Sequence, residues 1–179
     1  MRLDELIKLV PYDPDYLELL CAWRKDAVVR QYNPIEDLSS KELHERFSDA
    51  ASDFEDVDVT DLIFWIIQAD QKPVGHITVK NINHRLLTAE IGYAIAPEAR
   101  KNGYATDAVR LVTLRAFNES ALRKLIAYVH EENLASQRVL EKVGYTAEGL
   151  LREHYIVNGE PTNEIIYGVL RREIVAGQQ

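Results

Sequence analysis

The chain has 179 residues, of which 46% are hydrophobic and 28% are charged, and its formal net charge at pH 7 is −8. This length and composition predict a single globular domain over residues 1–179. The acidic balance argues against nucleic acid as a partner, because phosphate neutralisation requires clustered Lys and Arg side chains.

The sequence contains no apolar run of the ~20 residues that a membrane-spanning helix needs, so we expect no membrane contact. Residues 1–5 are charged and lack the apolar core of a signal peptide. Cys21 is the only cysteine, so no internal disulfide can form. These features predict a cytoplasmic protein.

Sequence patterns in the first third of the chain predict one strand and two helices. Residues 6–10 form the strand, and a turn around Asp13 follows. Apolar side chains at helical spacing predict a first helix with one apolar face, formed by Tyr16, Leu17, Leu20 and Trp23. Ser39 and Glu42 match a capping box, which predicts a second helix toward residue 51. An acidic loop follows at residues 49–61.

The middle of the chain predicts three strands and a longer helix. Residues 62–68 and 74–80 form a hairpin around the turn that contains Pro73. Residues 88–95 form the next strand. A helix that begins near Ala105 then carries one apolar face, formed by Ala105, Ala108, Val109, Val112 and Ala116.

The last third predicts a strand at residues 125–129 and a short helix at residues 134–143, which Gly144 ends as a C-cap. Two late strands follow at residues 147–157 and 164–170, joined through the hairpin signal Asn158-Gly159. One mixed sheet with helices on both faces satisfies this order of elements, which places the chain in the α/β class.

Residues 100–105, Arg-Lys-Asn-Gly-Tyr-Ala, form a turn between the 88–95 strand and the helix that follows. The first N–H groups of a helix have no partner inside it, and with the helix dipole they favour a phosphate. Gly103 lets the backbone approach a ligand closely, and Arg100 and Lys101 add positive charge. The turn therefore predicts a diphosphate site.

The spacing of Arg100, Gly103 and Ala105 resembles motif A of the GNAT acetyltransferase superfamily, whose turn holds the pyrophosphate of acetyl-CoA. Residues 89–98 resemble the strand before that turn, and residues 133–145 resemble the second coenzyme segment. The resemblance covers residues 6–170. It implies a GNAT fold, which is a mostly antiparallel mixed sheet of about seven strands with helices on both faces. The implied coenzyme contacts are Ile95, Ala96, Arg100, Lys101, Asn102, Gly103, Tyr104, Ala105, Thr106, Asn133 and Ser136.

Glu90 is the candidate general base. Strand alternation places it on one face with Gly92 and Ala94, and a carboxylate in a central strand is costly unless it is hydrated, paired or functional. In several enzymes of the resembling superfamily, a glutamate on this strand accepts the amine proton, usually through water. The alternative is a structural carboxylate bonded to a neighbouring strand.

Asn133 and Ser136 open the helix at residues 134–143. Helix capping explains both residues, while the resemblance implies that Asn133 bonds the pantetheine arm and that Ser136 assists the leaving thiol as a catalytic residue. Tyr145, Tyr155 and Tyr167 are the other candidate acids. The five histidines lack metal-ligand spacing, so we expect no metal site.

Residues 155–168 resemble the branch of the superfamily that acetylates the N-terminal amines of ribosomal proteins, but depart from it at residues 161–163. The expected acceptor is such an amine. A polyamine, an antibiotic or another small amine is an alternative, for which the acidic loop is a candidate surface. A non-catalytic CoA-binding module is the third possibility. The resemblance also implies a homodimer with the Asn158-Gly159 hairpin near the acceptor groove, because apolar residues of the late strands look exposed, namely Ile156, Val157, Ile165 and Ile166.

Overall fold

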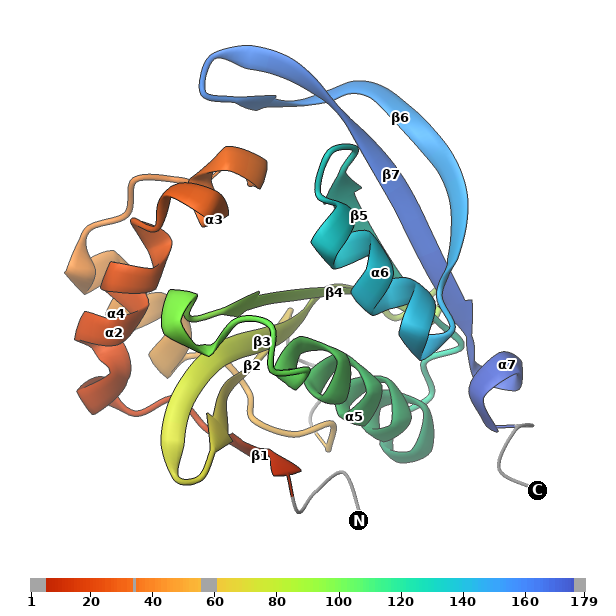
Figure 1. Ribbon diagram of the computed structural model, residues 1–179. Helices are drawn as coiled ribbons and strands as arrows, with labels where there is room; N and C mark the ends of the chain where they lie inside the picture. The colour runs from red at the N-terminus through yellow and green to blue at the C-terminus, as the bar shows by residue number, and fades with distance from the viewer. Residues whose placement is uncertain (1–5, 34, 56–60, 176–179) are drawn as a thin grey trace.

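The computed structural model describes residues 6–33, 35–55 and 61–175 (Figure 1). The strands of this part form one sheet in the order β1-β2-β3-β4-β5-β7-β6. Their bounds are β1 Lys8–Val10, β2 Leu62–Ala69, β3 Lys72–Asn83, β4 Thr88–Ile95, β5 Lys124–His130, β6 Thr146–Val157 and β7 Glu160–Leu170. Neighbouring strands are antiparallel except β4 and β5, which are parallel. The predicted mixed, mostly antiparallel sheet is confirmed.

Helices cover both faces of this sheet (Figure 1). The described helices are α2 Leu17–Arg24, α3 Ala27–Tyr32, α4 Ser40–Ser48, α5 Tyr104–Glu119, α6 Leu134–Val143 and α7 Arg171–Val175. On one face, Phe64 of β2 stacks on Phe47 of α4 with ring centroids 4.1 Å apart. On the other face, the guanidinium of Arg115 in α5 lies 5.3 Å from the ring centroid of Trp65. None of these helices is long and apolar enough to cross a membrane.

Local sequence signals fix several element ends where we predicted them. The Ser39 hydroxyl accepts the Glu42 N–H at 3.2 Å and the Glu42 carboxylate accepts the Ser39 N–H at 2.8 Å, so the capping box begins α4. Gly144 has a φ of +103° and ends α6. Asn158 and Gly159, with φ of +53° and +87°, turn the chain between β6 and β7.

Other boundaries differ from prediction. The first strand is shorter than residues 6–10, the strand predicted at residues 74–80 extends from Lys72 to Asn83, and the last strand begins at Glu160 rather than residue 164. The extensions to Lys72 and Glu160 follow from the tight hairpin turns, which let pairing continue to the turn residues. The extension to Asn83 includes a register shift between Lys80 and Asn83. The short helix α3 was not predicted. Residues 56–60 of the acidic loop lie outside the described residues.

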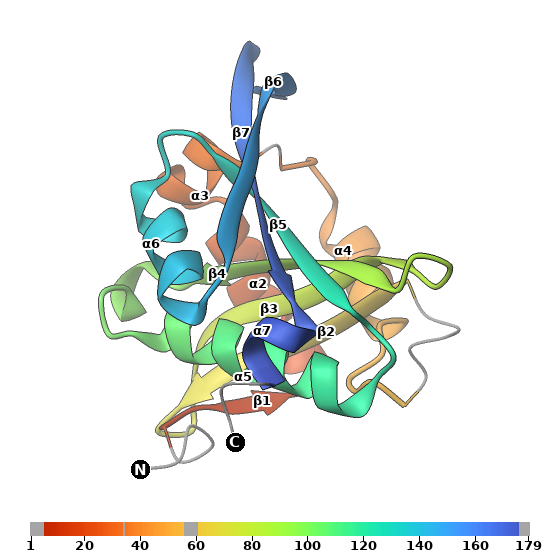
Figure 2. The same ribbon diagram turned by 90° about the vertical axis from the view of Figure 1, so that its right-hand side faces the viewer.

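The expected exposure of the late strands is only partly correct. Ile156 is 65% exposed, but Val157 is buried. Ile165 and Ile166 are half-buried because β7 lies between β5 and β6 instead of at the sheet edge. The edge strand is β6, and the β6–β7 hairpin extends beyond the rest of the sheet (Figure 1, Figure 2).

Candidate active site

Strands β4 and β5 pair only at their beginnings. The parallel register joins residues 88–90 to residues 124–126 and stops at Glu90 and Ile126, although β4 continues to Ile95 and β5 to His130. Beyond that point the facing backbone edges have no strand partner among the described residues. Such an edge can hydrogen-bond an extended ligand that carries amide groups.

The turn at residues 100–105 leads from the end of β4 into α5. Gly103 is the N-cap of α5 with a φ of +87°, and no side chain caps the helix there. The amide nitrogen of Asn102 donates to the carbonyls of Ala99 at 3.1 Å and Arg100 at 3.3 Å, which braces the turn. The N–H groups of the first turn of this 16-residue helix therefore suit a bound phosphate.

Arg100 is already engaged by the protein. Its guanidinium bonds the Asp26 carboxylate and donates to the Ile95 carbonyl at 3.3 Å. Asp26 also caps α3 by accepting the Val29 N–H at 3.0 Å, and the hydrogen bond from Arg100 holds the pKa of the Asp26 carboxyl below its ordinary value. The charge that we expected Arg100 to add to the turn is thus balanced by Asp26.

Glu90 lies on β4, with a side chain that is 13% exposed. Its carboxylate pairs with the Lys80 ammonium at 2.9 Å and accepts a hydrogen bond from the Asn81 amide at 2.7 Å. Both partners lie on β3, so the carboxylate is bonded to a neighbouring strand, as one of the two sequence interpretations proposed. A carboxylate held in this way still has lone pairs for a third donor.

Sequence reasoning missed Glu164 on β7. This residue is 5% exposed, and its Oε2 has no hydrogen-bond partner among the described residues. Burial, followed by repulsion from Glu90, raises the pKa of Glu164 to about 7, against a smaller opposing effect of Lys80. The signal in the sequence is a lone carboxylate at the start of an apolar run.

Ser136 and Tyr93 form a pair that sequence reasoning also missed. The two hydroxyls are 2.8 Å apart, and the Tyr93 hydroxyl also approaches the Ser136 carbonyl at 3.3 Å. Burial raises the pKa of Tyr93 to about 12, so the phenol keeps its proton at neutral pH. Asn133 caps α6 by accepting the Ser136 N–H at 3.1 Å. The capping interpretation of these residues is therefore confirmed.

The three tyrosines considered as acids differ in their surroundings. Tyr145 is buried and bonds the Thr113 hydroxyl at 2.9 Å, and burial raises its pKa. Tyr167 is buried and donates to the Glu141 carboxylate at 3.2 Å. Both hydroxyls have structural partners, which are the buried Thr113 and the exposed Glu141. Tyr155 is 42% exposed on the edge strand β6.

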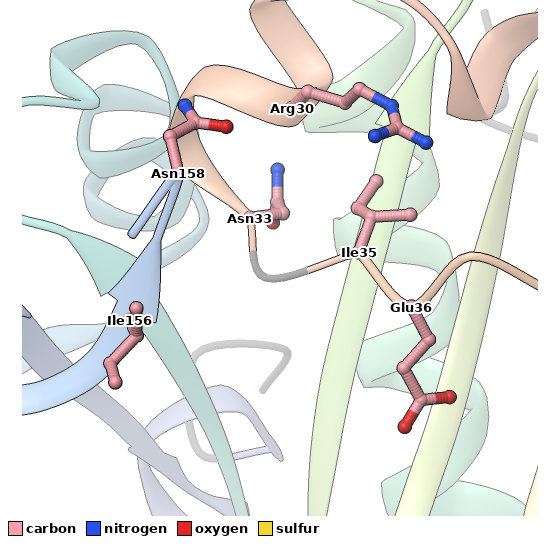
Figure 3. Close-up of a pocket in the computed structure, with 6 residues that line it drawn as sticks. All are labelled: Arg30, Asn33, Ile35, Glu36, Ile156 and Asn158. Carbon is pink, nitrogen blue, oxygen red and sulfur yellow. The ribbon is translucent and has the colours of Figure 1, made fainter. Parts of the chain in front are cut away.

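An open pocket of 270 Å³ lies between α3 with its following segment and the tip of the β6–β7 hairpin (Figure 3). The residues that line it are Arg30, Asn33, Ile35, Glu36, Ile156 and Asn158. The ring of Tyr32 in α3 lies 5.3 Å from that of His130 at the end of β5. The hairpin tip and the N-terminal helices thus border one opening near the end of β5.

Known proteins are similar to this chain in sequence and in fold. A family model described as an acetyltransferase (GNAT) domain matches residues 7–146. The spermidine N(1)-acetyltransferase of Escherichia coli (strain K12) is 29% identical over 112 residues, which are 63% of this chain and 60% of the relative. The putative ribosomal N-acetyltransferase YdaF of Bacillus subtilis (strain 168) is 34% identical over 99 residues, which are 55% of this chain and 54% of the relative.

The chain spans little more than half the length of the curated relatives that it matches. Among solved structures, spermidine N-acetyltransferase from Vibrio cholerae in complex with CoA and spermine aligns with a TM-score of 0.81 at 21% identity, covering 95% of this chain and 98% of that chain. This likeness shows the shared fold. Because the family model covers most of the sequence, the chain belongs to the GNAT acetyltransferase family.

Proposed function

We propose that this protein transfers the acetyl group of acetyl-CoA to a primary amine. The observation that carries the proposal is the continuity of the open β4 edge with the uncapped N-terminus of α5. Ile95 lies five positions along the strand from Glu90, a span of about 17 Å at 3.3 Å per residue. An extended pantetheine arm has this reach, so a diphosphate bound at the turn would bring the thioester close to Glu90.

The coenzyme contacts in this proposal follow from the groups that are available. The backbone N–H groups of residues 103–106 bind the diphosphate. Ile95 and Ala96 contact the coenzyme through the backbone that leads to this turn. The amide oxygen of Asn133 lies in the α6 cap, and its amide nitrogen, which has no partner among the described residues, can donate to the pantetheine arm. Lys101, which makes no ion pair with another described residue, supplies a positive charge.

The transfer then proceeds without a covalent enzyme intermediate. Glu90 takes a proton from R–NH3⁺, directly or through water, and the neutral amine attacks the thioester carbonyl. The C–N bond forms, the attacking nitrogen loses a second proton to solvent, the C–S bond breaks, and the thiolate takes a proton from the Ser136–Tyr93 pair. Ser136 regains a proton from solvent and Glu90 releases its own. The balance is R–NH3⁺ plus acetyl-CoA giving R–NH–CO–CH3, CoA–SH and H⁺.

The acceptor that we propose first is the N-terminal amine of a protein such as a ribosomal protein. The pocket between α3 and the hairpin is open, which suits a chain that continues beyond its reacting end. A polyamine is the second candidate, because the carboxyl groups of Glu90 and Glu164 lie close enough to interact and two such groups can bind a cationic amine. An antibiotic amine or a non-catalytic CoA-binding role are the remaining alternatives.

A thiol-release assay separates these possibilities. Acetyl-CoA would be offered with ribosomal N-terminal peptides, with spermidine and spermine, and with aminoglycosides. We expect release with the peptides, at a rate that depends on the first residue. Release with polyamines alone would replace the first acceptor by the second. Coenzyme binding without release for any amine would contradict the proposed activity.

We also propose a homodimer and a cytoplasmic location. The location is supported by the single cysteine, which suits a reducing compartment. The dimer is supported by β6, an edge strand that exposes Leu150, Tyr155 and Ile156. An edge with large apolar side chains is usually covered by another chain or element.

A further inference from the structure

We propose that Glu164 is a second acidic residue of the acceptor site, where it binds the ammonium group of the acceptor together with Glu90. This inference rests on the proposed acetyl transfer, because it gives Glu164 a role toward the amine in that reaction. It adds a residue on β7 to a site otherwise built from β4, β5 and α6.

The strand register places both carboxylates on one face of the sheet. Glu90 is the partner of Ile126 on β5, Tyr128 is the partner of Ile166, and His130 is the partner of Glu164 on β7. Side chains of paired positions point to the same face. Glu90 and Glu164 therefore lie on the face that α2 and α4 cover, away from α5.

Tyr128 lies among these groups. Burial raises its pKa, and Glu90, Tyr155 and Glu164 raise it further, in that order. The His154 ring of β6 stacks on Tyr128 with centroids 5.5 Å apart. The groups that face Glu164 are thus Glu90, Tyr128, His130 and His154, with Lys80 as the cation. A site of this kind is acidic and has aromatic walls.

Among the described residues, no lysine or arginine forms an ion pair with Glu164. Lys80 is already paired with Glu90 at 2.9 Å, and Glu164 Oε2 is buried without a partner among the described residues. A buried carboxylate oxygen without a donor is costly, and such groups in folded proteins call for a missing partner. An ammonium group, with three N–H donors, can bond Glu90 and Glu164 at once.

The chemistry balances as a proton exchange. With its pKa near 7, Glu164 holds a proton for much of the time at neutral pH when the site contains no amine. On arrival of R–NH3⁺, the Glu164 carboxyl releases that proton to solvent and its carboxylate pairs with the ammonium. Glu90 then removes one proton from the bound ammonium group, and this deprotonation precedes the attack of the amine. Glu164 binds the acceptor in this scheme, and Glu90 acts as the base.

The first test follows the ionisation of Glu164 directly. In full-length protein labelled with ¹³C, the side-chain carboxyl resonance of Glu164 is assigned through its side-chain carbons and its backbone, and is titrated in the presence of CoA. Saturating n-butylammonium chloride should lower the titration midpoint by about one pH unit or more, as a cation within hydrogen-bond distance does. Potassium chloride and n-butanol at equal concentrations should leave it unchanged. A midpoint that n-butylammonium does not move would overturn the inference.

The second test is kinetic and uses the acceptor identified by thiol release. Glu164→Gln removes the charge but keeps the shape, so the acceptor KM should rise about 10- to 100-fold, the worth of a hydrogen bond to a charged group. The coenzyme KM should not change. Glu119→Gln, an exposed carboxylate at the end of α5, is the matched control and should behave as wild type. An unchanged acceptor KM in Glu164→Gln would reject the role of Glu164 in binding the acceptor while leaving acetyl transfer intact. Absence of turnover by the wild-type protein with every amine would instead reject the proposed function.

Discussion

Glu90 is held in place by side chains of the neighbouring strand and also lies where an open strand edge begins. Lys80 and Asn81 fix its position through contacts of 2.9 Å and 2.7 Å, while the strand pairing of β4 with β5 ends at this residue. A fixed carboxylate beside an open strand edge has the geometry that a general base needs.

We expect Glu90→Gln to lower turnover by about 10²–10⁴-fold, the usual contribution of general-base catalysis. The amide oxygen of glutamine can still accept one of the two hydrogen bonds from β3, but glutamine cannot take the proton of the amine. Calorimetry should give an acetyl-CoA affinity close to that of wild type. The rate profile should lose the pH limb that belongs to the base. A variant that turns over normally at every pH would make Glu90 structural.

Glu164 makes stability depend on pH. Its pKa is raised from the ordinary value of 4.5 to about 7 in the folded protein, so the folded state binds this proton more tightly than the unfolded state. The resulting stabilisation is fully present below pH 4.5 and is lost as pH rises through 7. Glu164→Gln should therefore gain stability relative to wild type across this interval, by at most about 1.4 kcal/mol per pH unit. Urea unfolding at several pH values measures this difference, and parallel curves for the two proteins would contradict it.

At the scale of elements, the turn before α5 depends on the conformation of Gly103. Its φ of +87° disfavours any side chain, although the nearest atom to an added Cβ is Asp107 Oδ2 at 3.9 Å. A substitution is thus strained by the backbone and not by a clash.

Gly103→Glu should abolish acetyl-CoA binding, because the new carboxylate lies where we place the diphosphate. Gly103→Gln carries the same backbone strain and nearly the same volume without the charge, so it should bind weakly but measurably. Calorimetry on both folded variants gives the comparison. Equal acetyl-CoA affinities for the two variants would mean that the phosphates do not lie on this turn. A Gly103→Glu affinity equal to that of wild type would lead to the same conclusion.

The β6–β7 hairpin offers a test of acceptor selection. Ile156 is 65% exposed and lines the pocket opposite α3 (Figure 3), so Ile156→Ser removes an apolar contact for a bound acceptor. The acceptor KM should rise several-fold, as expected for about 1–2 kcal/mol of lost burial, while the coenzyme KM stays constant. Leu86→Ser, at an exposed position between β3 and β4 and outside the pocket lining, is the control. Equal kinetics for both variants would place acceptor selection elsewhere.

Elements with strong local signals could be predicted from the sequence, and elements held by distant contacts could not. The capping box at Ser39 and the C-cap at Gly144 act within a few residues, so α4 and α6 were predicted correctly. Helix α3 has six residues and depends on Asp26, which Arg100 holds from 74 positions away. No local pattern records that contact.

The difference between local and distant contacts also explains which residues of the candidate site could be predicted from the sequence. Glu90 and the turn at Gly103 belong to one continuous motif, so the sequence identifies both as candidates. Glu164 gains its raised pKa only when β7 is inserted between β5 and β6, because that order brings its face of the sheet beside Glu90. Single-sequence alternation identifies a strand face but not which strands are neighbours.

At the scale of the whole molecule, the sheet has one edge that remains apolar. The β1 edge is only three residues long, whereas β6 is a 12-residue edge strand. It carries Leu150 at 52% exposure and Ile156 at 65% exposure. Register shifts interrupt its pairing with β7 between residues 151 and 155, and Glu153 adopts a φ of +48° there. Irregularity of this kind limits open-ended strand addition and is compatible with one closed, two-fold interface.

Light scattering at micromolar concentration should accordingly give twice the chain mass of 20.5 kDa. Leu150→Asp places a charge on the exposed edge and should yield monomers if β6 forms the interface, because an unpaired charge buried between two chains is costly. Val28→Asp, at a 46% exposed position on α3, is the matched control and should stay dimeric. A monomeric wild-type mass would remove the dimer altogether. A dimeric Leu150→Asp beside a monomeric Val28→Asp would move the interface to α3, and so to the helices beside the proposed acceptor opening.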